Sequence, residues 1–184
     1  TAGATQAAQA LALDAGLVPA DKRQGVVDHL VSNVYAFHPE GDGPHFSGGT
    51  IGMSPIVRSL TAAGRDDVLW ELLQEDDYPS YGYFMASTPE NPGGFTTIGE
   101  RWTRGSSKNH MILAQVEEWF QSGVAGIRSA PGAVAYDRLV FQPKAVGDLT
   151  YAKGSYRTPK GEARSAWSRT DRRFELKVTV PTNT

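Results

Sequence analysis

The sequence predicts an α+β chain in which helical hairpins come first and antiparallel strands follow. Apolar residues recur at helical spacing over the first two-thirds of the chain, and the period changes to two after about Gly126. Short connections between the successive helical segments favour antiparallel pairs of helices. We therefore expect a helical region that ends near Gly126 and an antiparallel β region beyond it.

The first two expected helices cover residues 5–18 and 20–35. On the first, Ala7, Ala8, Leu11 and Ala15 lie on one face, and the segment ends at Gly16 with Pro19 beyond it. The second carries an apolar stripe made of Val26, Val27, Leu30, Val31 and Val34. Each face is expected to pack against neighbouring helices.

Three further helices are expected over residues 49–64, 65–74 and 106–123. The first two of these join near Gly64, and Asp66 and Asp67 suit the positive end of the helix dipole. The last carries apolar residues at helical spacing and ends at Gly123. Those apolar residues are Ile112, Val116, Trp119 and Phe120.

Two long loops, residues 36–49 and 75–102, interrupt this series of helices. The second is too long for a simple connector in a compact domain, and loops of such length are usually functional or disordered. It carries five aromatic residues before Trp102, which argues against disorder. These are Tyr78, Tyr81, Tyr83, Phe84 and Phe95.

Four segments after Gly126 are expected to be strands, over residues 136–143, 149–158, 161–169 and 173–180. Turn signals separate them at Gly147–Asp148, at residues 159–161 and at Thr170–Asp171. An antiparallel arrangement follows from the short turns.

Composition excludes several classes of function. The net charge of the 184 residues is -2 and no basic stripe is present, so we expect neither nucleic-acid binding nor attraction to an anionic membrane. No apolar run reaches the roughly eighteen residues that a membrane span requires. The chain contains no cysteine, which rules out disulfides and is compatible with both a secreted and a cytoplasmic protein. Its start, "TAGATQAAQ", has neither an initiator methionine nor a signal peptide, so a longer polypeptide is expected.

The motifs of metal and phosphate sites are missing. The four histidines lie apart in the sequence, without the HxxxH or HExxH spacing of a zinc site. No calcium loop, glycine-rich phosphate loop or GxSxG elbow is found. We therefore predict no metal and no cofactor.

Glu100 is the strongest candidate for chemistry. It lies in the aromatic loop between Gly99 and Arg101–Trp102. A carboxylate among aromatic rings suits a sugar, because rings stack on the C–H faces while the carboxylate binds hydroxyls or moves protons. The alternative is an exposed, solvated glutamate. His110 and His45 are similarly open: each either packs or caps a helix, or donates a hydrogen bond to a substrate hydroxyl.

The order of several segments resembles the C-terminal part of bacterial α-L-rhamnosidases of glycoside hydrolase family 78. The segments include "HFSGGTIGMSPIVRSL", "YPSYGYF", "TTIGERW", "NHMILAQVEEWFQSGVAGI" and "LTYAKGSYRTPKGEARSAW". The likeness runs through nearly the whole chain. It implies that residues 1–126 are the last helical hairpins of an (α/α)6 catalytic barrel and that residues 127–184 are a C-terminal β-sandwich.

The resemblance also implies inverting hydrolysis of terminal α-L-rhamnosyl linkages in glycosides or polysaccharides. Inversion uses a general acid and a general base, with a water between the base and the anomeric carbon. By this likeness Glu100 in "TTIGERW" corresponds to the base and His110 to a sugar-contacting histidine. Trp102, and His45 in "PHFSGGT", are expected near the sugar. The family's general acid belongs to an earlier segment, which would precede Thr1.

Two departures from the family pattern alter the rim of the expected pocket. A Pro/Gly-rich run, "ASTPENPGG", precedes the base, and "TRGSSK" after Trp102 is short. These differences leave the identity of the sugar open.

A different class of function is a carbohydrate-binding or assembly module without chemistry of its own. The missing acid distinguishes the two hypotheses, because such a chain binds weakly and hydrolyses nothing. A nicked protein, in which this chain associates with the preceding part of the barrel, is a third arrangement. It would cover the inner helix faces that a cut barrel exposes.

Overall fold

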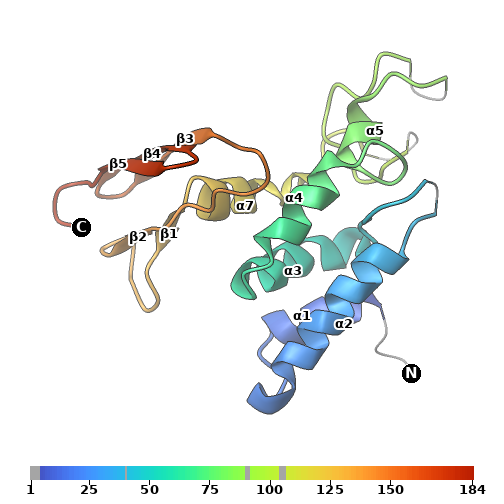
Figure 1. Cartoon of the computed structure of the whole chain (residues 1–184), viewed down its shortest axis with the longest axis horizontal. Coiled ribbons are helices and arrows are strands. Elements are labelled where there is room, and N and C mark those ends of the chain that lie inside the picture. Colours follow the sequence, from blue (N-terminus) through green and yellow to red (C-terminus); the bar gives the residue numbers. More distant parts are fainter. Residues whose placement is uncertain (1–4, 40, 90–91, 104–106) are drawn as a thin grey trace. The chain divides into compact units, whose positions relative to one another are not determined.

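The computed structural model describes residues 5–39, 41–89, 92–103 and 107–184 of the chain. Helices come first and antiparallel strands follow, which confirms the predicted α+β order (Figure 1). The chain divides into two compact units, Thr1–Val116 and Glu117–Thr184, called here the helical unit and the strand unit.

The helical unit contains six α-helices and one short 3-10 helix within its described residues. In chain order they are α1 (Gln6–Asp14), η1 (Ala20–Lys22), α2 (Arg23–Ala36), α3 (Gly49–Ala62), α4 (Asp66–Gln74), α5 (Tyr81–Met85) and α6 (Met111–Ala114). Helix α1 packs against both α2 and α3, while α3 also contacts α4 and α6 (Figure 1). Helix α3 therefore lies at the centre of the unit.

The core of the helical unit is built from the apolar faces of α2, α3 and α4. Its members are Val27, Leu30, Val34, Met53, Ile56, Leu60, Val68, Leu69 and Leu72. The stripe predicted for residues 20–35 is thus confirmed at its three inner positions. Gly52 lets α1 approach α3 closely, because a side chain there would collide with Ala7.

The face predicted for the first helix is wrong. The buried residues of α1 are Gln6, Gln9 and Ala10, whereas Leu11 is 40% exposed. Gln6 is buried because its amide bridges three backbone groups: Nε2 donates to the carbonyls of Asn33 and His45, and Oε1 accepts from the amide of Ser47. A fully hydrogen-bonded polar side chain can occupy a core position.

The helix expected over residues 106–123 is also wrong as a continuous element. Residues 107–110 precede α6, and the chain continues as α7 (Glu117–Trp119) and a π-helical turn, η2 (Phe120–Val124); residue 106 lies outside the described part. The π turn closes through a 2.8 Å bond from the amide of Ala125 to the carbonyl of Phe120. Trp119 is fully buried, whereas the adjacent Phe120 is 40% exposed.

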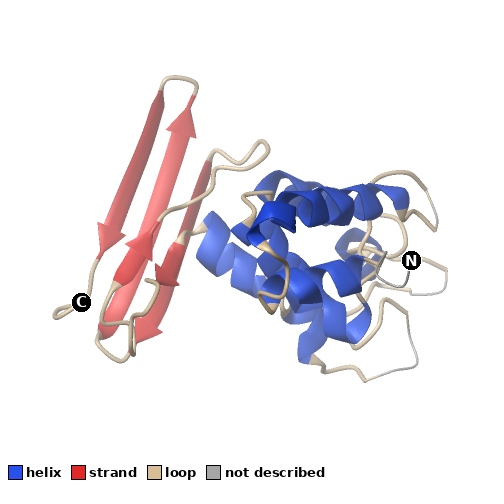
Figure 2. Ribbon diagram, turned by 90° about the horizontal axis from the view of Figure 1, so that it is seen from below, coloured by secondary structure: helices blue, strands red, loops and turns tan. Residues whose placement is uncertain are grey.

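The strands of the strand unit form two antiparallel sheets (Figure 2). β1 (Ile127–Ser129) pairs with β2 (Leu139–Phe141), and β3 (Tyr151–Thr158), β4 (Gly161–Thr170) and β5 (Arg173–Thr179) form the second sheet in sequence order. β1 contacts both β3 and β4. The last three strands match the predicted ranges within two residues. β1 was not predicted, and β2 is shorter than expected.

The central strand β4 organises the interior of the strand unit. Ala163, Ser165 and Trp167 are buried and alternate with exposed residues, as expected for a strand with one covered face. The indole Nε1 of Trp167 donates a 2.8 Å hydrogen bond to the carbonyl of Val124. No helix within the described residues is long and apolar enough to cross a membrane.

Candidate functional site

The long loop between α4 and α6 is fixed at both ends. Ser80 caps α5 by accepting a 3.0 Å hydrogen bond from the amide of Tyr83. The buried Tyr81 hydroxyl donates to the carbonyl of Leu113 and so joins α5 to α6. Burial raises the pKa of Tyr81 far above its ordinary value, so this hydroxyl keeps its proton and remains a donor.

Five aromatic side chains, called here the aromatic cluster, pack beside this loop. Trp102 meets Tyr81 edge-on at 4.9 Å and Phe84 at 6.1 Å between ring centroids. Phe84 stacks on Phe95 at 4.1 Å, and Phe46 packs edge-on against Tyr81. Such aromatic pairs stabilise the fold by more than the burial of their apolar surface alone. The loop that was predicted to be ordered by its aromatic residues is ordered in this way over its described part.

Glu100 lies on a segment whose backbone is paired with the residues that precede α6. Its amide donates a 3.0 Å hydrogen bond to the carbonyl of Ser107, and the amide of His110 donates one of 3.0 Å to Ile98. Gly99 is buried between these bonds, and a side chain there would press on the Ser107 carbonyl and on Phe84. Glu100 and His110 are half-buried and lie on two adjacent, hydrogen-bonded segments.

His110 is the N-cap of α6. Its Nδ1 accepts a 3.3 Å hydrogen bond from the amide of Ile112. An acceptor Nδ1 in a neutral imidazole leaves the proton on Nε2. The ring therefore presents Nε2–H as a donor. Both readings of this residue in the sequence, a helix cap and a donor to a substrate, are compatible with this geometry.

His45 is placed differently. Its side chain is buried, Nδ1 lies 3.1 Å from the carbonyl of Gly43, and Nε2 lies 2.5 Å from a carboxylate oxygen of Asp77. Because a carbonyl only accepts, Nδ1 must carry a proton. In this conformation both ring nitrogens are engaged, and His45 ties the α2–α3 loop to the α4–α5 loop.

Glu75 and Asp77 are site residues that the sequence did not single out. One atom each of His45, Glu75 and Asp77 lie within 4.8 Å of one another, so the three could hold a metal ion. Burial raises the pKa of the Glu75 carboxyl, and nearby Asp77 raises it further while His45 opposes the change. Motif spacing could not find this cluster, because its members come from two loops that only the fold brings together. We assign no metal to it, since the His45–Asp77 hydrogen bond already satisfies that pair.

The site as a whole combines a half-buried carboxylate, an imidazole donor and an indole ring. Trp102 is half-buried and held on two sides by Tyr81 and Phe84, so part of its surface is free for an apolar face of a ligand. A carboxylate can bind a hydroxyl or accept a proton from water. This set of groups is suited to a sugar.

Helical hairpins followed by antiparallel sheets define the class of the chain as a helical domain with a C-terminal β domain. Residues 1–124 match the family model of the bacterial alpha-L-rhamnosidase 6-hairpin glycosidase domain, and residues 126–184 match that of the bacterial alpha-L-rhamnosidase C-terminal domain. The chain belongs to the bacterial α-L-rhamnosidase family.

Curated relatives and solved structures agree with this assignment. The chain is 32% identical to an α-L-rhamnosidase of Streptomyces avermitilis over 99% of its length, and 30% identical to one of Alteromonas sp. over 97%. A structure of α-L-rhamnosidase from Dictyoglumus thermophilum matches 98% of the chain with a TM-score of 0.84 and 33% identity. The Streptomyces avermitilis enzyme complexed with L-rhamnose matches 98% with a TM-score of 0.83 and 31% identity.

The chain spans only part of these proteins. It covers 18% and 19% of the two curated relatives, and 20% and 17% of the two solved chains. These shares equal about a fifth of each relative.

Proposed function

We propose that this chain supplies the general base and part of the sugar pocket of an inverting α-L-rhamnosidase. In the proposed reaction Glu100 accepts a proton from a water molecule, whose oxygen attacks the anomeric carbon. A general acid protonates the departing glycosidic oxygen as the bond to the anomeric carbon breaks. The substrate is a glycoside or polysaccharide with terminal α-L-rhamnose.

The placement of Glu100 carries this proposal. Its segment is paired with the one that leads to His110, and it lies beside the aromatic cluster in a chain of the rhamnosidase family. A general base must be positioned so that its carboxylate oxygen can reach the proton of the attacking water. Glu100 is half-buried and lies on an ordered, hydrogen-bonded backbone, which supports this role.

The neighbours of Glu100 take separate roles in the proposal. His110 donates from Nε2 to a sugar hydroxyl, since its Nδ1 is used by the helix cap. Trp102 offers a ring face to the apolar side of the sugar. His45 is proposed to support the pocket indirectly by joining the α2–α3 loop to the α4–α5 loop, because both of its ring nitrogens are engaged in this conformation.

The general acid is proposed to lie in a part of the enzyme outside these residues. Inverting glycosidases place the two carboxyl groups roughly 6.5–9.5 Å apart to leave room for the water. The proposal divides the chain functionally into residues 1–126 of the catalytic barrel and residues 127–184 of the C-terminal β domain. The preceding part of the same barrel is then the partner that this chain requires.

The replacement Glu100→Gln in the complete enzyme tests the proposal. We expect kcat on an aryl α-L-rhamnoside to fall by about 10²–10⁴, because the amide cannot accept the proton of the water. The thermal unfolding midpoint should stay the same, since the exchange is nearly isosteric. Proton NMR of the first product formed by the wild-type enzyme should show β-L-rhamnose.

The matched control is Glu162→Gln, an exposed glutamate of β4 in the strand unit. Its kcat should equal that of the wild type. A Glu100→Gln enzyme that keeps its activity within about tenfold would refute the role of Glu100 as base. An α-anomeric first product would refute inversion.

A further inference from the structure

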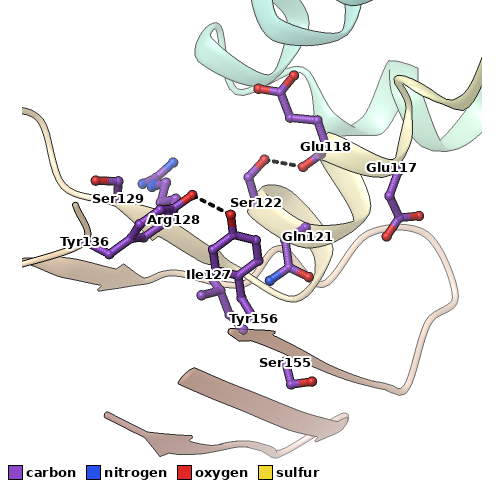
Figure 3. Close-up of a pocket in the computed structure, with 10 residues that line it drawn as sticks. All are labelled: Glu117, Glu118, Gln121, Ser122, Ile127, Arg128, Ser129, Tyr136, Ser155 and Tyr156. Carbon is purple, nitrogen blue, oxygen red and sulfur yellow. Dashed lines mark hydrogen bonds between the residues drawn. The ribbon is translucent and has the colours of Figure 1, made fainter. Parts of the chain in front are cut away.

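A cavity of about 570 Å³ lies within the strand unit, formed by α7, η2, β1, the β1–β2 loop and β3 (Figure 3). All the residues that line it belong to residues 117–156, so it contains no part of the Glu100 site. Its volume is in the range of small-molecule sites. The proposed reaction gives this cavity no role.

Two tyrosines form one wall of the cavity. The rings of Tyr136 and Tyr156 lie 5.0 Å apart and are tilted by 38°, and the Tyr136 hydroxyl donates a 3.1 Å hydrogen bond to that of Tyr156 (Figure 3). Tyr156 is 38% exposed although it lies on an ordered strand. The pair therefore presents aromatic surface and two hydroxyl oxygens to the same space.

The backbone that places Tyr136 is strained. Ala135 and Tyr136 have φ angles of 52° and 59°, a left-handed conformation that residues other than glycine rarely adopt. Backbone strain of this kind concentrates at functional sites. Here the strained turn carries the Tyr136 side chain to the cavity, where it meets Tyr156.

Charged and neutral polar side chains line the cavity together with the two tyrosines. Gln121 lines the cavity, and its Nε2 is buried without a hydrogen-bond partner among the residues that the structure describes. An unsatisfied buried amide donor is destabilising, and an oxygen of a ligand in the cavity would satisfy it. The lining contains two acidic side chains, Glu117 and Glu118, and one basic side chain, Arg128. Its net charge is therefore negative, which disfavours an anionic ligand.

We propose that this cavity binds a neutral saccharide unit at a site separate from the proposed active site. The C–H face of a sugar packs on Tyr156 and Tyr136, the Gln121 amide donates to one of its oxygens, and Glu117 and Ser155 bind its hydroxyls. The site would hold a second sugar of a branched or polymeric substrate. This inference is carried by the cavity itself and stands whether or not Glu100 is the general base.

Titration of the full 184-residue chain, labelled with ¹⁵N, tests the proposal. The probes are L-rhamnose, D-galactose and lactose, with D-glucuronate as an anionic comparison. At least one neutral probe should shift the amide signals of residues around Gln121, Tyr136 and Tyr156, and glucuronate should bind more weakly. Tyr156→Ala should weaken this binding at least about tenfold, the loss expected for one aromatic contact.

Three variants make the result specific. Tyr156→Phe keeps the ring and should bind within about threefold of the wild type, because only the hydroxyl contact is lost. Tyr151→Ala removes an exposed tyrosine of the same strand that does not line the cavity, and it should bind as the wild type does. His110→Ala alters the other proposed sugar site and should leave these shifts unchanged.

The proposal fails if none of the neutral probes shifts the amides around the cavity. It also fails if the shifts persist in Tyr156→Ala or disappear in His110→Ala, since the sugar would then bind elsewhere. These outcomes are independent of the kinetics of Glu100→Gln, so the second site and the proposed activity can fail separately.

Discussion

The helical unit and the strand unit use polar side chains in different ways. In the helical unit, Gln6, Ser59 and Tyr81 each reach a backbone group far away in the sequence. In the strand unit the ladders of β3, β4 and β5 set the register. Two side chains of the central strand β4 add long-range bonds to backbone carbonyls: Trp167 donates to Val124, and Arg169 donates to Ala145, Gly147 and Leu149. The comparison teaches that a regular ladder of strands follows from a regular sequence pattern, whereas the packing of the helical unit also depends on individual polar contacts between its elements.

The largest effect on stability is expected for Trp167→Ala in the strand unit. The indole is 3% exposed, and replacing such a side chain typically costs about 3–5 kcal/mol of unfolding free energy. Amide hydrogen exchange should show faster exchange in β4 and β5, with little change in α2 and α3.

Trp167→Phe is the matched variant, because it keeps a ring but removes the donor to Val124. Its cost should be smaller, near the 1–3 kcal/mol of one unsatisfied buried carbonyl plus the lost volume. Equal loss of protection in α2 and α3 would show that the two units unfold together, and the comparison between them would then be wrong.

A smaller effect is expected for Gln6→Leu in the helical unit. The leucine fills similar space but leaves the carbonyls of Asn33 and His45 and the amide of Ser47 without the Gln6 amide. We expect a loss of about 2–4 kcal/mol in urea denaturation, because a buried carbonyl without a partner, that of His45, costs about 1–3 kcal/mol and the two partly buried groups cost less.

The control for Gln6 is Gln24→Leu. Gln24 is exposed and donates to Asp28 one turn along α2, so its replacement should change stability by less than about 0.5 kcal/mol. A Gln6→Leu protein as stable as this control would show that the buried amide does not hold α1 in place.

The smallest effect is expected for Asp14→Asn. Arg58 on α3 donates to both carboxylate oxygens of Asp14, at 2.9 and 2.7 Å, and this contact lowers the pKa of the Asp14 carboxyl below 3.8. Both side chains are partly exposed, so the pair is worth about 0.2–1 kcal/mol.

The pH dependence of this pair has a definite sign. A lowered pKa means that the pair stabilises the fold above the unfolded pKa, and that the gain is lost as pH falls through the folded pKa. The difference in unfolding free energy between wild type and Asp14→Asn should therefore be constant from pH 5 to 7 and shrink below about pH 4. A difference that grows on acidification would contradict the assignment.

The regular elements could be predicted from the sequence wherever one periodicity dominated. The apolar stripe of α2 and the alternation along β4 are examples, since each pattern has one buried face. The buried face of α1 could not, because Gln6 is buried by partners at Asn33 and His45 that a helical pattern does not contain. The breaks near α6 and η2 could not be predicted either. A π turn contains the same kinds of apolar residues as an α-helix, so the sequence does not show where the helical spacing changes.

The residues of the candidate site could be predicted only in part from the sequence. The resemblance of "TTIGERW" and "NH" to the family drew attention to Glu100 and His110, and those two positions remain the proposed base and sugar donor. Nothing in the local sequence indicated that His45 would be buried against Asp77, or that Glu75 would lie beside them. The cavity around Tyr136 was missed as well, because left-handed φ angles at Ala135 and Tyr136 are unexpected for residues other than glycine.

The contact between Phe84 and Phe95 determines how well the protein tolerates insertions and deletions in the loop between them. The amide of Phe95 donates a 3.0 Å hydrogen bond to the carbonyl of Phe84, and the two rings stack. The two ends of the intervening loop are therefore held together. Insertions or deletions within that stretch need not move Glu100, because loop length adds little entropic cost once the ends are joined. Lengthening or shortening this one loop is therefore expected to change substrate specificity while the proposed base, Glu100, stays in place.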